Sequence, residues 1–188
     1  MSIQLADKIG TGITPAQFIE GMTKNKEAFT GWYDKFEWPS AEDRSFFESL
    51  SGKHSLRCFI LMADWCGDAV RNIPVVLHAL EAAQIPVEVL IMEQHLDTMD
   101  QFLTFGGRSI PVVIFTDEQG QVLGKWGPRP SYVQEAMVQF KQNNPDRNAA
   151  DYETNLAETR KEIMRRYGEG AAYHPLIISE LRELIGSF

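Results

Sequence analysis

The residues best suited to chemistry lie at positions 63–75, which read ADWCGDAVRNIPV. Cys66 stands where an apolar run ends and a helical pattern begins, so we expect it at a helix N-terminus. Unpaired backbone N–H groups and the helix dipole stabilise an anion there, and the thiolate is the form of cysteine that attacks disulfides. Asp64 and Asp68 flank the cysteine and oppose its ionisation. The stretch therefore predicts a nucleophilic thiol, with the direction of its pKa shift left open.

A second thiol is missing from this stretch. A two-cysteine redox motif would place it three residues after Cys66, and the residue there is Ala69. The other cysteine, Cys58, lies eight residues before Cys66 within an expected strand. Because strands rise ~3.3 Å per residue, Cys58 should lie about 15–25 Å from Cys66, beyond the roughly 7 Å Cα separation that a disulfide allows. We therefore expect Cys58 to be a buried core residue.

Apolar runs and helical patterns alternate around Cys66. Buried or hairpin strands are expected at residues 56–63, 86–92, 110–115 and 121–126. Helical patterns lie between and after them, at residues 70–80, 96–105 and 130–142. The order β-α-β-α-β-β-α predicts a crossover unit whose sheet is covered on both faces.

Further helices are expected on both sides of this middle part. Residues 14–36 read as one amphipathic helix, in which Thr14 and Gln17 form a capping box and Pro15 occupies the first helical position. A second short helix is expected to start at Ser40. Two more are expected at residues 151–167 and 175–186.

Four motifs follow one another along residues 55–142. DWCG follows the first strand and opens a helix, and Pro74 lies eight residues after Cys66. FGGRSIPVVIF contains Ile110-Pro111, and GKWG contains Gly127. With these motifs, residues 55–142 resemble the thioredoxin family, which has a helix-kinking proline at the place of Pro74, an Ile-Pro cis peptide at the place of Ile110-Pro111 and a glycine lining the site at the place of Gly127. The resemblance implies an α/β, thioredoxin-like fold: a central mixed β-sheet covered by helices on both faces, with extra N-terminal and C-terminal helices.

The domain organisation follows from the extent of this resemblance. Residues 1–54 would be an N-terminal helical extension and residues 55–142 the thioredoxin-like domain. Residues 143–188 would be a C-terminal helical extension packed on the same domain.

The resemblance also implies a site. Cys66 would be catalytic, Trp65 would wall one side of its sulfur, and Gly67 would leave the sulfur approachable. The backbone of Ile110 would pair with an extended substrate segment, as in strand addition. The candidate substrate groove consists of Trp65, Gly67, Asp68, Ile110, Pro111 and Gly127.

Two departures from the family pattern belong together. Ala69 replaces the resolving cysteine, and Ile60 stands where the family has a buried aspartate that assists proton transfer at that cysteine. The sequence therefore lacks both the cysteine that would resolve a mixed disulfide and the aspartate that would assist it, while the residues of the groove remain. This selective loss favours a one-thiol site, or a retained groove, over random decay.

Three functions remain open. The first is a monothiol redox protein, a possible thiol–disulfide oxidoreductase in cell redox homeostasis, in which Cys66 forms a mixed disulfide with a protein or a low-molecular-weight thiol. The second resembles a monothiol glutaredoxin that carries an iron–sulfur ligand set with glutathione, although no cationic cradle for thiol carboxylates is evident. The third is a non-catalytic binding module. No cofactor is expected beyond such a small thiol, and a peroxidase is disfavoured.

Other polar and aromatic residues suggest ordinary structural roles. Arg71 could face the site or solvent, and solvent is the favoured expectation. Trp126 could either cover the groove or pack in the core. The basic cluster of the expected helix 151–167 reads as a solvated face; it consists of Arg160, Lys161, Arg165 and Arg166. The histidines lack metal-ligand spacing; they are His54, His78, His95 and His174.

Composition limits the class of protein. The 188 residues carry a formal net charge of −8, which argues against nucleic-acid binding. Two cysteines do not make a disulfide scaffold. Neither a signal-peptide pattern nor an apolar run long enough to span a membrane is seen, so we expect a cytoplasmic protein without a membrane partner. The oligomeric state stays open.

Overall fold

A computed structural model describes residues 3–52 and 55–188. A four-stranded mixed sheet lies at its centre, in the order β2-β1-β3-β4. Strand β1 (Arg57–Met62) runs parallel to β2 (Val87–Ile91) and antiparallel to β3 (Val112–Thr116), and β3 is antiparallel to β4 (Val122–Trp126). This is the mixed sheet that the sequence predicts.

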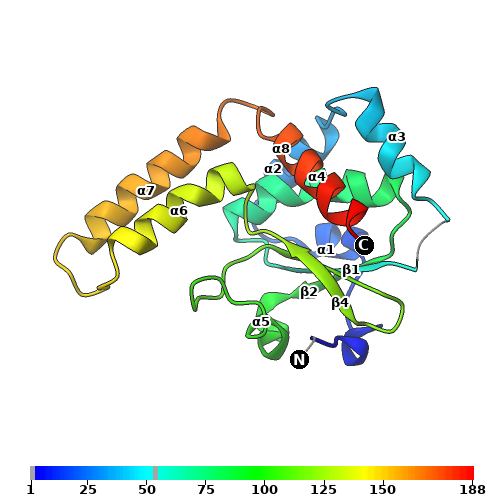
Figure 1. Cartoon of the computed structure of the whole chain (residues 1–188), viewed down its shortest axis with the longest axis horizontal. Helices are drawn as coiled ribbons and strands as arrows, with labels where there is room; N and C mark the ends of the chain where they lie inside the picture. The colour runs from blue at the N-terminus through cyan, green and yellow to red at the C-terminus, as the bar shows by residue number, and fades with distance from the viewer. Residues whose placement is uncertain (1–2, 53–54) are drawn as a thin grey trace.

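The two central strands are covered on both faces. Every residue of β3 and all but the first of β1 are buried. Helices α4 (Gly67–Ala82) and α8 (His174–Gly186) lie on one side of the sheet (Figure 1). The short helix α5 (Leu96–Met99) and the N-terminal turn η1 (Ala6–Lys8) lie on the other (Figure 1). Because the strands are apolar on both faces, helices are required on both sides.

Helix α4 is the central helix of the molecule. Its buried residues run from Ala69 to Leu80 and include Pro74 inside the helix. It packs against α2 (Lys26–Asp34), α3 (Ala41–Ser49) and α8. The N-terminal and C-terminal helices therefore share α4 as a packing partner.

The N-terminal segment contains a break that was not predicted. The capping box of Thr14 and Gln17 opens α1 (Pro15–Gly21), but the chain then leaves the helix and restarts at α2. The Asp64 carboxylate accepts hydrogen bonds from the backbone N–H groups of Thr23 (2.9 Å) and Lys24 (3.0 Å). The expectation of one helix over 14–36 is therefore wrong, because a distant carboxylate binds the N–H groups that a continuous helix would use.

Several further elements depart from their expected bounds, most of them by one to three residues. The helix expected over 96–105 shortens to α5, and the chain turns at Phe105 (φ 51°) and Gly106 (φ 73°), in the left-handed region. Helix α8 begins at His174, one residue earlier than expected.

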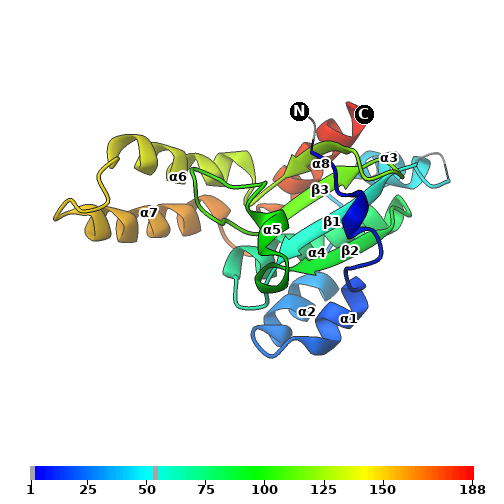
Figure 2. The same cartoon turned by 90° about the horizontal axis from the view of Figure 1, so that it is seen from below.

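Helices α6 (Ser131–Asn143) and α7 (Tyr152–Tyr167) form an antiparallel pair. Figures 1 and 2 show this pair projecting from the body of the molecule as an arm. The base of the arm lies near the start of α4. Across residues 3–52 and 55–188, no helix has the length and apolar character needed to cross a membrane.

Candidate functional site

Cys66 occupies the N-cap of α4 and faces the turn before β3. Its thiol donates a hydrogen bond to the carbonyl oxygen of Ile110, with 3.4 Å between sulfur and oxygen, and its exposed fraction is 8%. The Ile110–Pro111 peptide bond is cis. The sulfur therefore lies against the backbone that precedes Pro111.

Gly127 supports this turn from the end of β4. Its φ is +112°, and a Cβ there would overlap the carbonyl oxygen of Pro111. Only glycine allows the two backbones to approach this closely. The next peptide bond, Gly127–Pro128, is also cis, a feature not predicted from the sequence.

Burial raises the pKa of the Cys66 thiol above its ordinary value. The backbone N–H of Ala69 opposes this shift, the charge of Asp68 adds to it, and the Asp68 N–H and the Arg129 guanidinium oppose it. Because burial outweighs the helix N-terminus, the neutral thiol is the resting form at neutral pH.

The structure contains no resolving partner where the family pattern would have one. Ala69 and Ile60 are both fully buried. Cys58 is buried in β1, opposite Val87 and Phe115, and both cysteines are free thiols. Burial raises the pKa of Cys58 strongly. Cys58 is thus a core residue, as the sequence predicts.

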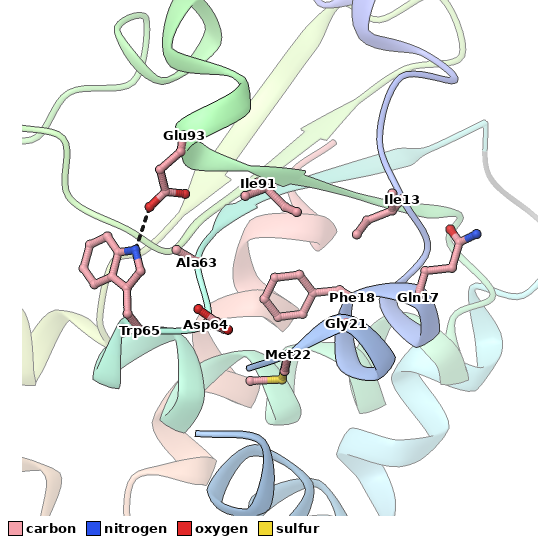
Figure 3. A pocket seen from close by; sticks show the side chains of 10 residues that line it. All are labelled: Ile13, Gln17, Phe18, Gly21, Met22, Ala63, Asp64, Trp65, Ile91 and Glu93. Atoms are coloured by element: carbon pink, nitrogen blue, oxygen red, sulfur yellow. Dashed lines mark hydrogen bonds between the residues drawn. The ribbon is translucent and has the colours of Figure 1, made fainter. Parts of the chain in front are cut away.

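Trp65 stands exposed at the edge of the site. Its side chain is 48% exposed, and its indole N–H donates to Glu93 (2.6 Å). It borders a pocket of about 270 Å³ between α1 and the ends of β1 and β2 (Figure 3). Apolar side chains dominate the lining, among them Phe18, Met22 and Ile91, which surround the space in Figure 3. The sequence did not reveal this pocket, because helix α1 and strand β2 that form it are far apart in the chain.

Asp68 belongs to a polar network at the start of α4. Its carboxylate forms an ion pair with Arg129 (2.7 Å) and accepts a hydrogen bond from the Tyr167 hydroxyl (2.8 Å). Asn72, one turn further along α4, donates to the Tyr167 hydroxyl (2.9 Å) and to the carbonyl of Pro128 (3.1 Å). The network joins α4, the segment after β4 and the base of α7.

Sequence reasoning missed Asn72, Arg129 and Tyr167. One signal was present: Asp68 and Asn72 are polar residues four apart on a helix whose other residues are mostly apolar, so they share one face. Arg129 and Tyr167 lie 61 and 99 residues from Asp68 along the chain. Nothing local marks them as its partners.

Arg71 does not face solvent as predicted. Its guanidinium lies over the rings of Trp32 (5.6 Å to the centroid) and Tyr167 (5.3 Å), and the residue is half-buried. The cation is attracted to the negative faces of the two rings, which come from the N-terminal and C-terminal helices. The position of Arg71 five residues after Cys66 does not show that these two rings lie beside α4.

Trp126 packs in the core rather than covering the groove. Its side chain is buried, and its indole N–H donates to Glu180 of α8 (2.7 Å). This satisfies the one polar atom of the ring.

The basic cluster on α7 divides into two kinds of residue. Lys161 and Arg165 are exposed and pair with acidic residues of their own helix, as on a solvated face. Arg166 is half-buried and pairs with Glu135 of α6 (3.0 Å) as well as with Glu162, so it links the two helices of the arm. For Arg166 the solvated-face interpretation is wrong.

His78 and His174 serve packing roles. The ring of His78 stacks on Tyr33 and Phe36, with centroids 4.1 and 4.4 Å apart. His174 is buried, and neither of its ring nitrogens has a hydrogen-bond partner. His95 is half-buried, and His54 lies outside the described residues. Within the described part of the chain, no group of three or more His, Cys, Asp or Glu residues could hold a metal ion.

Comparison with known proteins decides the family. A family model described as Thioredoxin matches residues 12–151. The chain belongs to the thioredoxin family. The match takes in α1, α2 and α3, which lie outside the residues on which the sequence resemblance rests.

Two solved structures share the fold of this thioredoxin-family chain. A crystal structure of a protein of unknown function from Pseudomonas aeruginosa has a TM-score of 0.69 at 17% identity and covers 98% of both chains. An HIV epitope scaffold has a TM-score of 0.68 at 16% identity and covers 99% of both chains. A search of curated proteins gave no match. These likenesses show that the fold is shared over nearly the whole chain, including the N-terminal and C-terminal helices.

Proposed function

We propose that this thioredoxin-family protein performs thiol–disulfide exchange through Cys66 as its single nucleophile. The observation that carries the proposal is the position of the sulfur, at the N-cap of α4 and 3.4 Å from the Ile110 carbonyl oxygen. The glycine-backed turn at Pro111 is kept, while Ala69 and Ile60 occupy the places of a resolving pair. The retained half of the site suffices for forming a mixed disulfide.

The exchange has two steps. The Cys66 thiolate attacks one sulfur of a substrate disulfide, a new bond forms between Cys66 and that sulfur, and the other sulfur leaves as a thiolate. An external thiol then attacks the mixed disulfide, takes the bound group and returns Cys66 to its reduced form. The chain's own residues hold the sulfur in place, and the backbone N–H groups of Asp68 and Ala69 stabilise its anion.

The raised pKa of Cys66 affects both the rate of exchange and the lifetime of the mixed disulfide. Only a small fraction of the thiol is ionised at neutral pH, so exchange is slower than at a site with an acidic cysteine. Each thiolate is in turn more nucleophilic, because nucleophilicity rises with thiol pKa. A monothiol of this kind suits the formation of long-lived adducts rather than rapid reduction.

The experiment is adduct trapping in cell lysate. Tagged wild-type protein, Cys66→Ser and the matched control Cys58→Ser are alkylated rapidly, isolated without reductant and examined by mass spectrometry. We expect disulfide-linked small thiols or proteins on Cys66 in the wild type and in Cys58→Ser, and none in Cys66→Ser. Wild-type protein whose Cys66 carries no adduct, even after a disulfide oxidant is added, contradicts the proposal.

A non-catalytic binding groove is the second candidate, favoured by the burial and raised pKa of Cys66. In that case partners bind beside Trp65 and Pro111 without a covalent link. The same partners would then be captured by Cys66→Ser as by the wild type, and would be lost on denaturation without reductant. Capture that survives denaturation and requires Cys66 favours the exchange reaction.

A further inference from the structure

A second pocket opens directly beside the start of α4. Its volume is about 280 Å³, and it lies against Gly67 and Asp68, the two residues that follow Cys66. Three guanidinium groups and two apolar side chains complete it: Arg71, Arg129, Arg160, Ile163 and Met164. They come from α4, from the segment after β4 and from α7, so only the folded chain assembles the pocket.

The pocket carries excess positive charge. Arg129 is neutralised by its ion pair with Asp68 (2.7 Å). Within residues 3–52 and 55–188, neither Arg71 nor Arg160 forms an ion pair with a carboxylate. Two cations thus remain without a paired anion, in a chain whose formal net charge is −8. A concentration of positive charge against this background points to an anionic ligand.

Arg71 and Arg160 are also placed so that they can bind an anion. The Arg71 guanidinium lies over the rings of Trp32 and Tyr167 and interacts with the Tyr173 hydroxyl, so it is held in place at the pocket. A guanidinium held in this way can bind a planar anion such as a carboxylate. Arg160 is exposed on α7 at the pocket.

We propose that this pocket binds the carboxylate end of a small thiol, or of its disulfide, while the sulfur end of the same molecule reacts with Cys66. The proposal rests on the exchange reaction proposed above and names its substrate class. Gly67 and Asp68 connect the pocket to Cys66 without an intervening residue. Burial dominates the pKa of the Cys66 thiol, yet the Arg129 guanidinium is close enough to lower it. The pocket volume suits part of a small molecule.

The first test compares small disulfides of different charge. Mixed-disulfide formation on Cys66 is followed by intact-protein mass spectrometry with 3,3′-dithiodipropionate (anionic) and bis(2-hydroxyethyl) disulfide (neutral), at fixed pH and low salt. Arg160→Glu should slow the reaction with the anionic disulfide roughly fivefold to tenfold and leave the neutral one within about twofold. Added salt should reduce the wild-type preference.

Lys161→Glu is the matched control, because it makes the same charge change one residue further along α7 and does not line the pocket. It should change both rates by less than about twofold. If Arg160→Glu and Lys161→Glu act equally on the anionic disulfide, the pocket is not the binding site and this proposal is overturned, while the exchange reaction stands.

A second measurement separates binding from reaction. Thiodipropionate, a thioether that cannot exchange, is titrated into Cys66→Ser protein by calorimetry. Binding weakened by Arg160→Glu and not by Lys161→Glu supports the pocket, even if Cys66 reacts with no disulfide and the exchange proposal fails. No detectable binding overturns the pocket proposal.

Discussion

At the level of single residues, Asp68 shifts the pKa of the Cys66 thiol in both directions. Its negative charge raises the pKa of Cys66, where burial is the larger cause, and its backbone N–H lowers it. Its carboxylate also holds Arg129, whose positive charge lowers the same pKa. Asp68 therefore influences the reactivity of Cys66 both directly and through the arginine that it binds.

Replacing Asp68 by Asn should make Cys66 more acidic. The substitution removes a charge that disfavours the thiolate and leaves the Arg129 charge uncompensated, and both changes lower the thiol pKa. The rate of alkylation by iodoacetamide, measured by intact mass across pH, should rise at lower pH than in the wild type. In the wild type the rate should still be rising above pH ~8.5, the ordinary cysteine value.

Asp34→Asn is the control, since Asp34 is exposed and lies outside the network. Its alkylation profile should match that of the wild type. An unchanged profile in Asp68→Asn would show that Asp68 does not control the thiol.

At the scale of elements, one carboxylate fixes how α1 and α2 meet the loop that carries Cys66. Asp64 accepts the N–H groups of Thr23 and Lys24, and Asn25 donates its side-chain amide to the Asp64 carbonyl (2.9 Å). These bonds replace the helical bonds that the segment gives up between α1 and α2. Asp64 also lines the apolar pocket beside Trp65, together with residues of α1 and β2.

Asp64→Ala should destabilise the protein by about 1–3 kcal/mol, because two backbone donors lose a charged acceptor. Urea unfolding followed by circular dichroism measures the loss. Asp34→Ala, a surface change of the same kind, should stay within about 0.5 kcal/mol of the wild type. If both variants unfold at the same urea concentration, the Asp64 bonds add nothing to the stability of this junction.

At the scale of the whole molecule, the N-terminal helices, α4 and α8 meet in one aromatic cluster. Trp32 and Phe36 come from the N-terminal part, His78 from α4, and Tyr173 and His174 from the start of α8. Burial, with a smaller effect of the nearby His78, lowers the pKa of His174 to about 4. The cluster therefore accepts a neutral imidazole and not a charged one.

This burial gives the fold a defined acid sensitivity. The unfolded chain binds a proton at His174 below about pH 6.5, whereas the folded chain does so only near pH 4, so stability is lost as pH falls through this window. At pH 5 the loss from this group is about 2 kcal/mol. His174→Phe keeps a ring of similar size and removes the titration.

Between pH 7 and pH 5 the free energy of unfolding should therefore fall less in His174→Phe than in the wild type. Urea unfolding at both pH values measures this difference, and the carboxylates common to both proteins cancel. An equal loss in the two proteins would place the acid sensitivity elsewhere.

The sequence was most informative where structure depends on local pattern. The apolar runs predicted all four strands, and the spacing of Thr14 and Gln17 predicted the start of α1. Cys66 could be placed at a helix start because both the strand before it and the helix after it are strongly patterned. These features need no partner from elsewhere in the chain.

Most of the missed features depend on residues that are distant in sequence. The break between α1 and α2 follows from Asp64, 41 residues beyond Thr23. The positive pocket joins Arg71, Arg129 and Arg160, each of which alone resembles an ordinary surface arginine. No cationic cradle near Cys66 was evident from the sequence for the same reason: spacing along the chain does not show which side chains α7 and the β4 end bring to α4.

The most direct test of the central claim is the mass of the intact, purified protein during exposure to a small disulfide. We predict one adduct per chain, on Cys66, which persists until an external thiol is added and which is absent from Cys66→Ser. Two results would contradict this: a Cys66 that stays unmodified under conditions in which the unfolded chain reacts, or an adduct that disappears without added thiol as Cys58 and Cys66 join.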